Sequence, residues 1–134
     1  MLKVAIYYGF LLGLALGAAL GVVAYFETVA LARGAGLGEV EITAFAVAVA
    51  GGAVVGGVIL WSFGGLLAGL LWRRVVLPWP LFGAAVGLLV AAVDMALYIA
   101  SQLEPDPKFI PVHVAIGVAL AAILKRKSRS GVGA

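Results

Sequence analysis

Long apolar runs separated by short polar segments form the dominant pattern of the chain. The runs cover residues 4–26, 42–72, 81–103 and 109–124. A helix needs about 20 apolar residues to cross the hydrocarbon core of a bilayer, and the fourth run is short by this measure. The pattern predicts an all-α integral membrane protein, a single domain of four transmembrane helices.

The first two runs each leave an alternative open. The run 4–26 is longer than the apolar core of a signal peptide, about 7–15 residues, so we expect a retained span rather than cleavage after Ala32. The run 42–72 would form a helix of roughly 46 Å, against roughly 30 Å of hydrocarbon. It must tilt, project from the bilayer or break, and the small residues of 62–65 mark the expected kink. A re-entrant segment over 63–72 is the alternative.

Charged residues gather where the runs end, and they divide unequally between the two sides of a four-span topology. Arg33 and Lys108 share one side with the acidic residues of the loops. The side that holds both termini has the other seven basic residues: Lys3, Arg73, Arg74, Lys125, Arg126, Lys127 and Arg129. Basic residues concentrate on the cytoplasmic side, so we expect a cell-membrane protein with cytoplasmic termini and a basic tail over 125–134. Trp72 and Trp79 fit an aromatic belt on the same side.

Small residues recur every four positions within the runs. The first run carries the longest stripe: Gly9, Gly13, Gly17 and Gly21. The later runs carry glycines at similar spacing: Gly52, Gly56, Gly83, Gly87 and Gly117. Lipid tails are as apolar as leucine, so helices associate in a membrane where small residues let two backbones approach. We therefore expect a glycine zipper, whose partners lie within the chain, in a homo-oligomer or on other membrane subunits.

The composition favours lipid over water as the solvent of the chain. Hydrophobic residues make up 65% of the 134 residues and charged residues only 11%, whereas soluble domains have about 25% charged residues. A soluble chain of this length could not bury so much apolar surface. The net charge of +3 comes from residues at span ends, so the sequence predicts the lipid bilayer, and no nucleic acid, as a partner.

The scarcity of cysteine and histidine limits the kinds of functional site that the chain can form. The chain has no cysteine, which excludes disulfides, thiolate metal sites and cysteine nucleophiles. His113 is the single histidine, so the chain cannot hold a haem between two of its own histidines, and it lacks three close ligands for zinc. The glycines lie in apolar spans and form no phosphate-binding loop. We therefore expect no metal, no cofactor and no catalysis.

Asp94 is the carboxylate that the sequence places inside the membrane. It lies about ten residues, or roughly 15 Å, before Glu104. A carboxylate at that depth costs about 2.5–3.5 kcal/mol on insertion scales, so such residues are usually paired or functional. Tyr98, one turn on, is the expected hydrogen-bond donor, and His113 and Glu27 complete a candidate polar site near the outer ends of their spans. The site could bind a cation, relay a proton or hold a headgroup, and Asp94 alone could be a structural staple.

Two functions remain open. The glycine stripes and the absence of a catalytic constellation favour a small accessory or structural subunit of a membrane complex. The intramembrane carboxylate of Asp94, on a helix face with small residues, favours instead a small homo-oligomeric transporter or channel. The sequence names no substrate, ion or partner.

Overall fold

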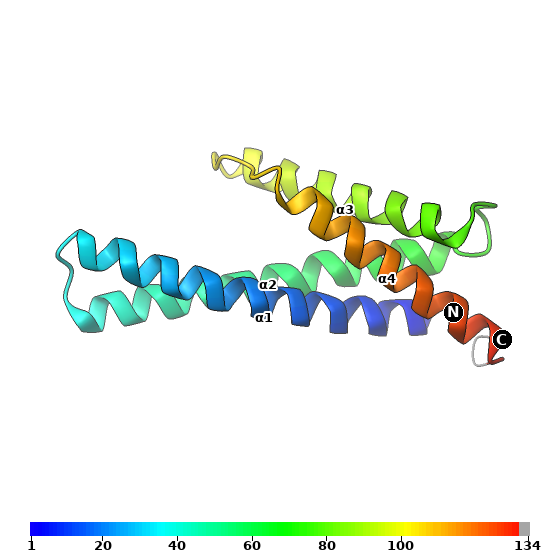
Figure 1. Cartoon of the computed structure of the whole chain (residues 1–134), viewed down its shortest axis with the longest axis horizontal. Coiled ribbons are helices and arrows are strands. Elements are labelled where there is room, and N and C mark those ends of the chain that lie inside the picture. The colour runs from blue at the N-terminus through cyan, green and yellow to red at the C-terminus, as the bar shows by residue number, and fades with distance from the viewer. Residues whose placement is uncertain (132–134) are drawn as a thin grey trace.

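The chain is all-helical over the residues that the computed structural model describes, 1–131 (Figure 1). Four helices follow one another: α1 (Leu2–Gly34), α2 (Glu39–Leu71), α3 (Trp79–Ala100) and α4 (Phe109–Arg129). Each is long and apolar enough to cross a membrane. The predicted all-α fold with four membrane-length helices is therefore confirmed at this level.

The helices are longer than three of the four apolar runs. α1 continues past residue 26 to Gly34, and α4 continues through the basic segment to Arg129. α2 is one unbroken helix from Glu39 to Leu71, so no re-entrant segment follows Ser62. A continuous helix pairs its backbone N–H and C=O groups internally except in its first and last turns, as lipid requires of a spanning segment. Residues 132–134 of the predicted tail lie outside the described residues.

Local chemistry accounts for where the helices begin and turn. α2 begins with two glutamates in its first turn, near the positive end of the helix dipole, and the Glu41 carboxylate accepts a hydrogen bond from the Gly38 N–H at 3.2 Å. α3 has Pro80 in its first turn, where the missing N–H costs nothing. Between α1 and α2, Gly36 has φ 75°, a left-handed conformation that favours glycine.

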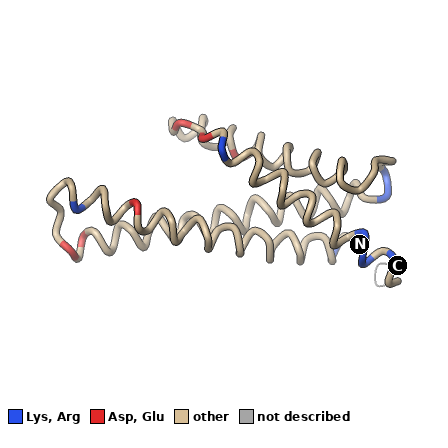
Figure 2. Tube along the Cα trace, viewed as in Figure 1, with Lys and Arg blue, Asp and Glu red and all other residues tan. Residues whose placement is uncertain are grey.

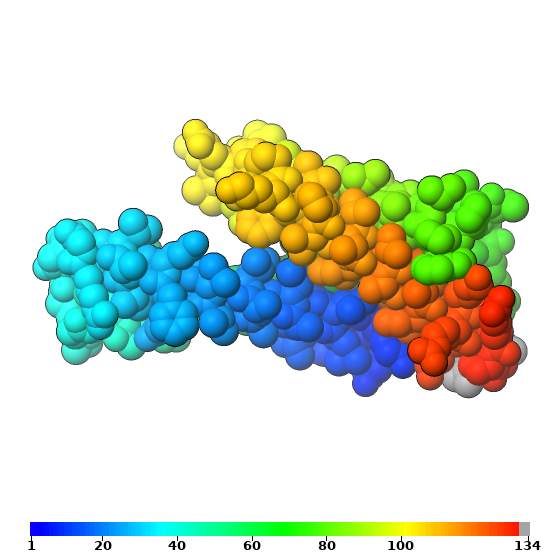
Figure 3. Space-filling view, viewed as in Figure 1, coloured from blue at the N-terminus to red at the C-terminus, as the bar shows by residue number. Residues whose placement is uncertain are grey.

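The four helices form two antiparallel hairpins of unequal length (Figure 1). The long hairpin is α1–α2, with 33 residues in each helix, or roughly 50 Å. The short hairpin is α3–α4, with 22 and 21 residues, or roughly 32 Å. The short hairpin lies against only part of the long one, and the far end of α1–α2 stands clear of it (Figure 3).

Most basic residues gather at one end of this arrangement, and the acidic residues lie away from that end (Figure 2). The start of α1, the α2–α3 connection and the end of α4 meet at one end, which we call the basic end. The connections α1–α2 and α3–α4 lie away from it, and four of the six acidic residues lie in or next to them: Glu39, Glu41, Glu104 and Asp106. The helix arrangement thus puts the seven basic residues of the predicted inner side at the same end of the molecule.

The four glycines of α1 face α2. A methyl group at Gly9 or Gly13 would collide with the backbone of α2, at the carbonyl oxygens of Trp61 and Gly57. At Gly17 it would come within 2.7 Å of the Val54 Cα. The two backbones therefore lie too close together for any side chain at these positions.

The glycines of α2 that meet α1 are not the two that the sequence pattern singled out. A methyl group at Gly52 or Gly56 would have no neighbour within 4 Å among the described residues, so neither packs against another helix of this chain. Gly57 and Gly65 lie against α1 instead. The packing face of α2 differs from the predicted one because α2 has small residues on several sides. The buried side chain of Trp61 lies one turn from Gly57, on the same side of the helix.

The short hairpin is closed in the same manner. Gly83 and Gly87 of α3 face Gly117 of α4, and a methyl group at any of the three would collide with the opposite backbone. At Gly87 the atom it would meet is the carbonyl oxygen of His113. This close approach fixes how α3 and α4 lie along each other, and with it the position of His113.

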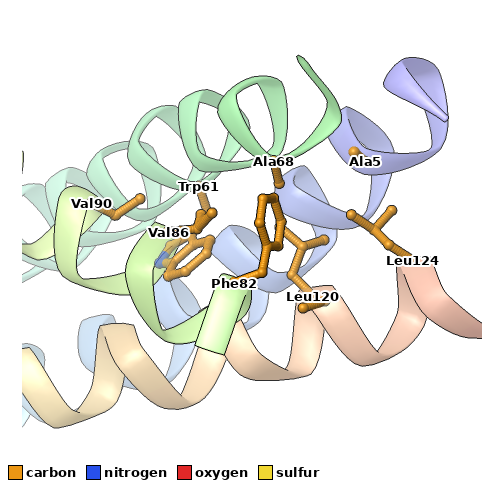
Figure 4. Packing of buried hydrophobic residues seen from close by; sticks show 9 residues of the cluster. Ala5, Trp61, Ala68, Phe82, Val86, Val90, Leu120 and Leu124 are labelled. Atoms are coloured by element: carbon orange, nitrogen blue, oxygen red, sulfur yellow. The ribbon is translucent and has the colours of Figure 1, made fainter. Parts of the chain in front are cut away.

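Large apolar side chains fill the space between the two hairpins (Figure 4). Trp61 of α2 is fully buried and points between α3 and α4, beside Phe82 and Leu120. On α1, the residues that pack against this core end at Leu16. Residues 17–59, the loop included, therefore form a two-helix segment beyond the core, which we call the distal hairpin.

Candidate functional site

The Asp94 carboxylate is paired with His113. The two residues lie on α3 and α4, and Nε2 of His113 is 3.1 Å from Oδ2 of Asp94. The His113 side chain is 5% exposed and the Asp94 side chain 18% exposed. The hydrogen bond offsets part of the free energy that removing the carboxylate from water costs.

Trp61 extends this pair to the long hairpin. Its indole Nε1–H donates a hydrogen bond to Nδ1 of His113 at 3.2 Å. The two rings are inclined by 27°, with centroids 5.9 Å apart. Trp61, His113 and Asp94 thus form a continuous hydrogen-bonded row across α2, α4 and α3, which we call the triad.

The triad fixes the protonation pattern of His113. An indole nitrogen can only donate, so Nδ1 must be the unprotonated nitrogen that accepts from Trp61. In a neutral imidazole the proton then lies on Nε2, which donates to the Asp94 carboxylate. A doubly protonated imidazolium would place a second N–H against the Trp61 N–H and break this hydrogen bond.

The folding of the short hairpin brings Asp94 and His113 together. Gly87 permits α3 and α4 to approach at the His113 carbonyl, and Asp94 lies two turns further along α3. The imidazole of His113 spans the remaining distance, and Trp61 covers it from α2. No buried side-chain nitrogen or oxygen lacks a hydrogen-bond partner within residues 1–131.

The other two residues of the predicted polar site lie elsewhere. Tyr98 is 37% exposed on α3, and no hydrogen bond joins it to Asp94 among the described residues. Glu27 is exposed on the distal hairpin, beyond the part of α1 that packs against the core. The predicted four-residue cluster is therefore wrong as a unit, because α1 extends past α3 and α4 and carries Glu27 away from them.

Trp61 is the member of the site that sequence reasoning missed. Tryptophan is typical of membrane interfaces, as at Trp72 and Trp79, but Trp61 lies eleven residues inside an uncharged run of α2. Its N–H needs an acceptor at such a depth. That requirement, together with a single histidine in the chain, is the signal that could have paired the two residues.

The interface anchors show two further contacts at the basic end. Nζ of Lys125 lies 5.3 Å from the centroid of the Trp79 ring, a cation–π distance. The ring of Trp72 meets Phe82 edge-on, with centroids 5.2 Å apart. Both tryptophans thus tie the α2–α3 connection to neighbouring helices.

The triad can hold, accept or release a proton, since it joins a carboxylate to an imidazole in an apolar setting. Within residues 1–131 no group of three histidine or acidic side chains lies close enough together to hold a metal ion. The four helices, with this buried polar row, are compatible with the class of multi-pass membrane proteins. Comparisons of the chain with protein-family models, curated proteins and solved structures found no match.

Proposed function

We propose that the chain is a small accessory or structural subunit of a complex in the cell membrane. The observation that supports this proposal is the open face of the distal hairpin. There α1 and α2 contact each other but neither α3 nor α4 covers them, and apolar side chains such as Phe26, Phe45 and Val47 are more than half exposed.

The shape of this face suits another transmembrane helix. A groove of about 480 Å³ runs along the distal hairpin, and Gly21, Tyr25 and Gly51 are among the residues that line it. Gly51 and Gly52 have open space where a side chain would be. Small residues let a second backbone approach closely in lipid. In this proposal, Gly51 and Gly52 of α2 form a glycine zipper with a helix of a neighbouring subunit.

The proposal includes an orientation with both termini in the cytoplasm, supported by the seven basic residues at the basic end. The absence of cysteine allows a direct test with single cysteines. Ser101→Cys lies at the far end of α3, and Ser128→Cys lies at the end of α4. An impermeant maleimide added to intact cells should label only the Ser101→Cys variant. Labelling of only the Ser128→Cys variant would show that both termini lie outside the cell.

Native mass spectrometry of the chain extracted from its own membrane tests the proposed role. We expect a complex with other polypeptides. A Cβ at Gly51 would meet no atom of this chain within 4 Å, so Gly51→Leu should project into the groove without displacing the α1 backbone and should release the partner. Ala92→Leu is the matched control on an exposed position of α3, and it should leave the complex intact. A chain that extracts alone contradicts the proposal, and a pure homo-oligomer would direct attention to the second candidate.

A second candidate function is transport by a homo-oligomer through Asp94. The favouring observation is that Asp94 keeps part of its side chain exposed while its other side joins the triad. Proton flux into liposomes containing the purified chain tests it. Asp94→Asn cannot ionise and should abolish the flux while the assembly persists. Equal flux in the variant would exclude Asp94 as the carrier.

A further inference from the structure

A hollow at the basic end lies between the first turns of α1 and the last turns of α4. It has a volume of about 280 Å³, and it is lined by Lys3, Val4, Tyr7, Tyr8 and Lys127. The two lysines are 124 positions apart in sequence, and only the antiparallel arrangement of α1 and α4 brings them to one site. The triad and the distal hairpin contribute nothing to this hollow.

The positive charge at this site is not paired with a carboxylate of residues 1–131. Neither Lys3 nor Lys127 forms an ion pair with a carboxylate anywhere in residues 1–131. The six acidic residues all lie away from the basic end (Figure 2): Glu27, Glu39, Glu41, Asp94, Glu104 and Asp106. Two ammonium groups with three donors each therefore border a hollow to which no acidic side chain of residues 1–131 is paired, and an anionic ligand would neutralise them.

The wall of the hollow is aromatic and amphipathic. The rings of Tyr7 and Tyr8 meet edge-on, with centroids 5.4 Å apart and an angle of 81°. Tyrosines typically lie at the boundary of hydrocarbon and headgroups, with the ring in apolar surroundings and the hydroxyl outside. The hollow thus combines cationic groups, hydroxyl groups and apolar surface.

The apolar surface continues from the hollow along α1. Tyr7, Leu11 and Leu14 follow one another at steps of four and three, which places them on one helix face. Their side chains are 58%, 37% and 39% exposed. An anion that carries an apolar chain would find a charged site and a neighbouring apolar path, whereas a free phosphate would use only the first.

We propose that this hollow binds the phosphate of an anionic phospholipid. Lys3 and Lys127 bind the phosphate oxygens, the tyrosine hydroxyls contact the glycerol region, and an acyl chain lies along the Tyr7–Leu14 face of α1. The lipid thereby links the start of α1 to the end of α4, which belong to different hairpins.

Native mass spectrometry with added lipid tests this site. The purified chain is titrated with phosphatidylglycerol and, separately, with phosphatidylcholine. We expect preferential binding of phosphatidylglycerol. The double variant Lys3→Gln/Lys127→Gln should bind it about thirtyfold more weakly, because each lysine near an anionic headgroup strengthens binding about fivefold. Restoring the charge with Lys3→Arg/Lys127→Arg should restore the binding, which separates the site from any effect on folding.

The matched control removes the same charge from residues outside the hollow. Lys108→Gln/Arg129→Gln should retain phosphatidylglycerol binding within about twofold, because neither residue lines the site. Equal losses in both double variants would show diffuse attraction and overturn the proposal, as would equal binding of phosphatidylcholine. Displacement of the lipid by millimolar inorganic phosphate would make free phosphate the ligand and overturn the assignment to a lipid.

Discussion

The contacts within each hairpin differ in kind from the contacts between the hairpins. Within the long hairpin Gly13 lies against Gly57, and within the short hairpin Gly117 lies against Gly83, so backbone meets backbone. Between the hairpins, large side chains such as Trp61 and Phe82 meet, together with the triad. Backbones in contact leave no room to adjust, whereas side chains can repack. The hairpins should therefore be rigid units, and the interface between them should be the adjustable part.

The largest effect should come from filling a contact within a hairpin. A side chain at Gly117 must displace the backbone of α3, since even a methyl group would lie 2.7 Å from the Gly87 nitrogen. Gly117→Leu should lower the free energy of unfolding by about 3 kcal/mol or more. Thermal unfolding in detergent, followed by circular dichroism, measures the change.

Gly52→Leu is the matched control for this substitution. Gly52 has open space around it within the described chain, and leucine favours the helix over glycine by up to about 1 kcal/mol. The purified variant should therefore be as stable as the original chain or slightly more stable. Similar losses in the two variants would mean that close backbone contact does not distinguish the two positions.

A smaller effect should come from the interface between the hairpins. Trp61→Phe leaves Nδ1 of His113 without its donor and should cost about 2 kcal/mol, since a buried unpaired polar atom costs about 1–3 kcal/mol. A double-mutant cycle with His113→Leu should show a coupling of about 0.5–3 kcal/mol. Additive effects of the two substitutions would show that the hydrogen bond contributes nothing to joining the hairpins.

The smallest effects should come from Asp94 and Glu27. Asp94→Asn retains a carbonyl oxygen that can accept the Nε2–H of His113, so it should cost less than about 1 kcal/mol. Glu27→Gln should change stability by less than about 0.5 kcal/mol, because Glu27 is an exposed residue outside the core. Chemical unfolding in mixed micelles measures both changes in stability. A larger loss of stability for Glu27→Gln than for Asp94→Asn would contradict the assignment of Asp94, and not Glu27, to the buried polar site.

The number of helices could be predicted from the sequence because each apolar run is of membrane length. The packing face of α2 could not, because small residues lie on several of its sides and periodicity does not choose between Gly56 and Gly57. Contact with α1 and the large side chain of Trp61 together determine which face of α2 is packed. Sequence periodicity thus identifies the packing face of a helix only where the helix has a single stripe of small residues.

The need of Asp94 for a polar partner could also be predicted, but not which partner it has. Tyr98 was expected because it is one turn away on the same helix, whereas His113 is the residue that binds. The relative position of α3 and α4, set by the glycine contacts at Gly87, decides this. Glu27 is predicted to join Asp94 because both are assigned to the outer half of the bilayer, but α1 extends past the core and places Glu27 on the distal hairpin.

The central claim is that the triad joins the two hairpins through one defined protonation pattern of His113. The chain has a single histidine, so ¹⁵N NMR of histidine-labelled protein in nanodiscs reports on this residue alone. At neutral pH we expect a protonated Nε2 and an unprotonated Nδ1, with the Nδ1 signal altered by Trp61→Phe. A proton on Nδ1, or spectra of an imidazole exchanging freely between both forms, would contradict the triad.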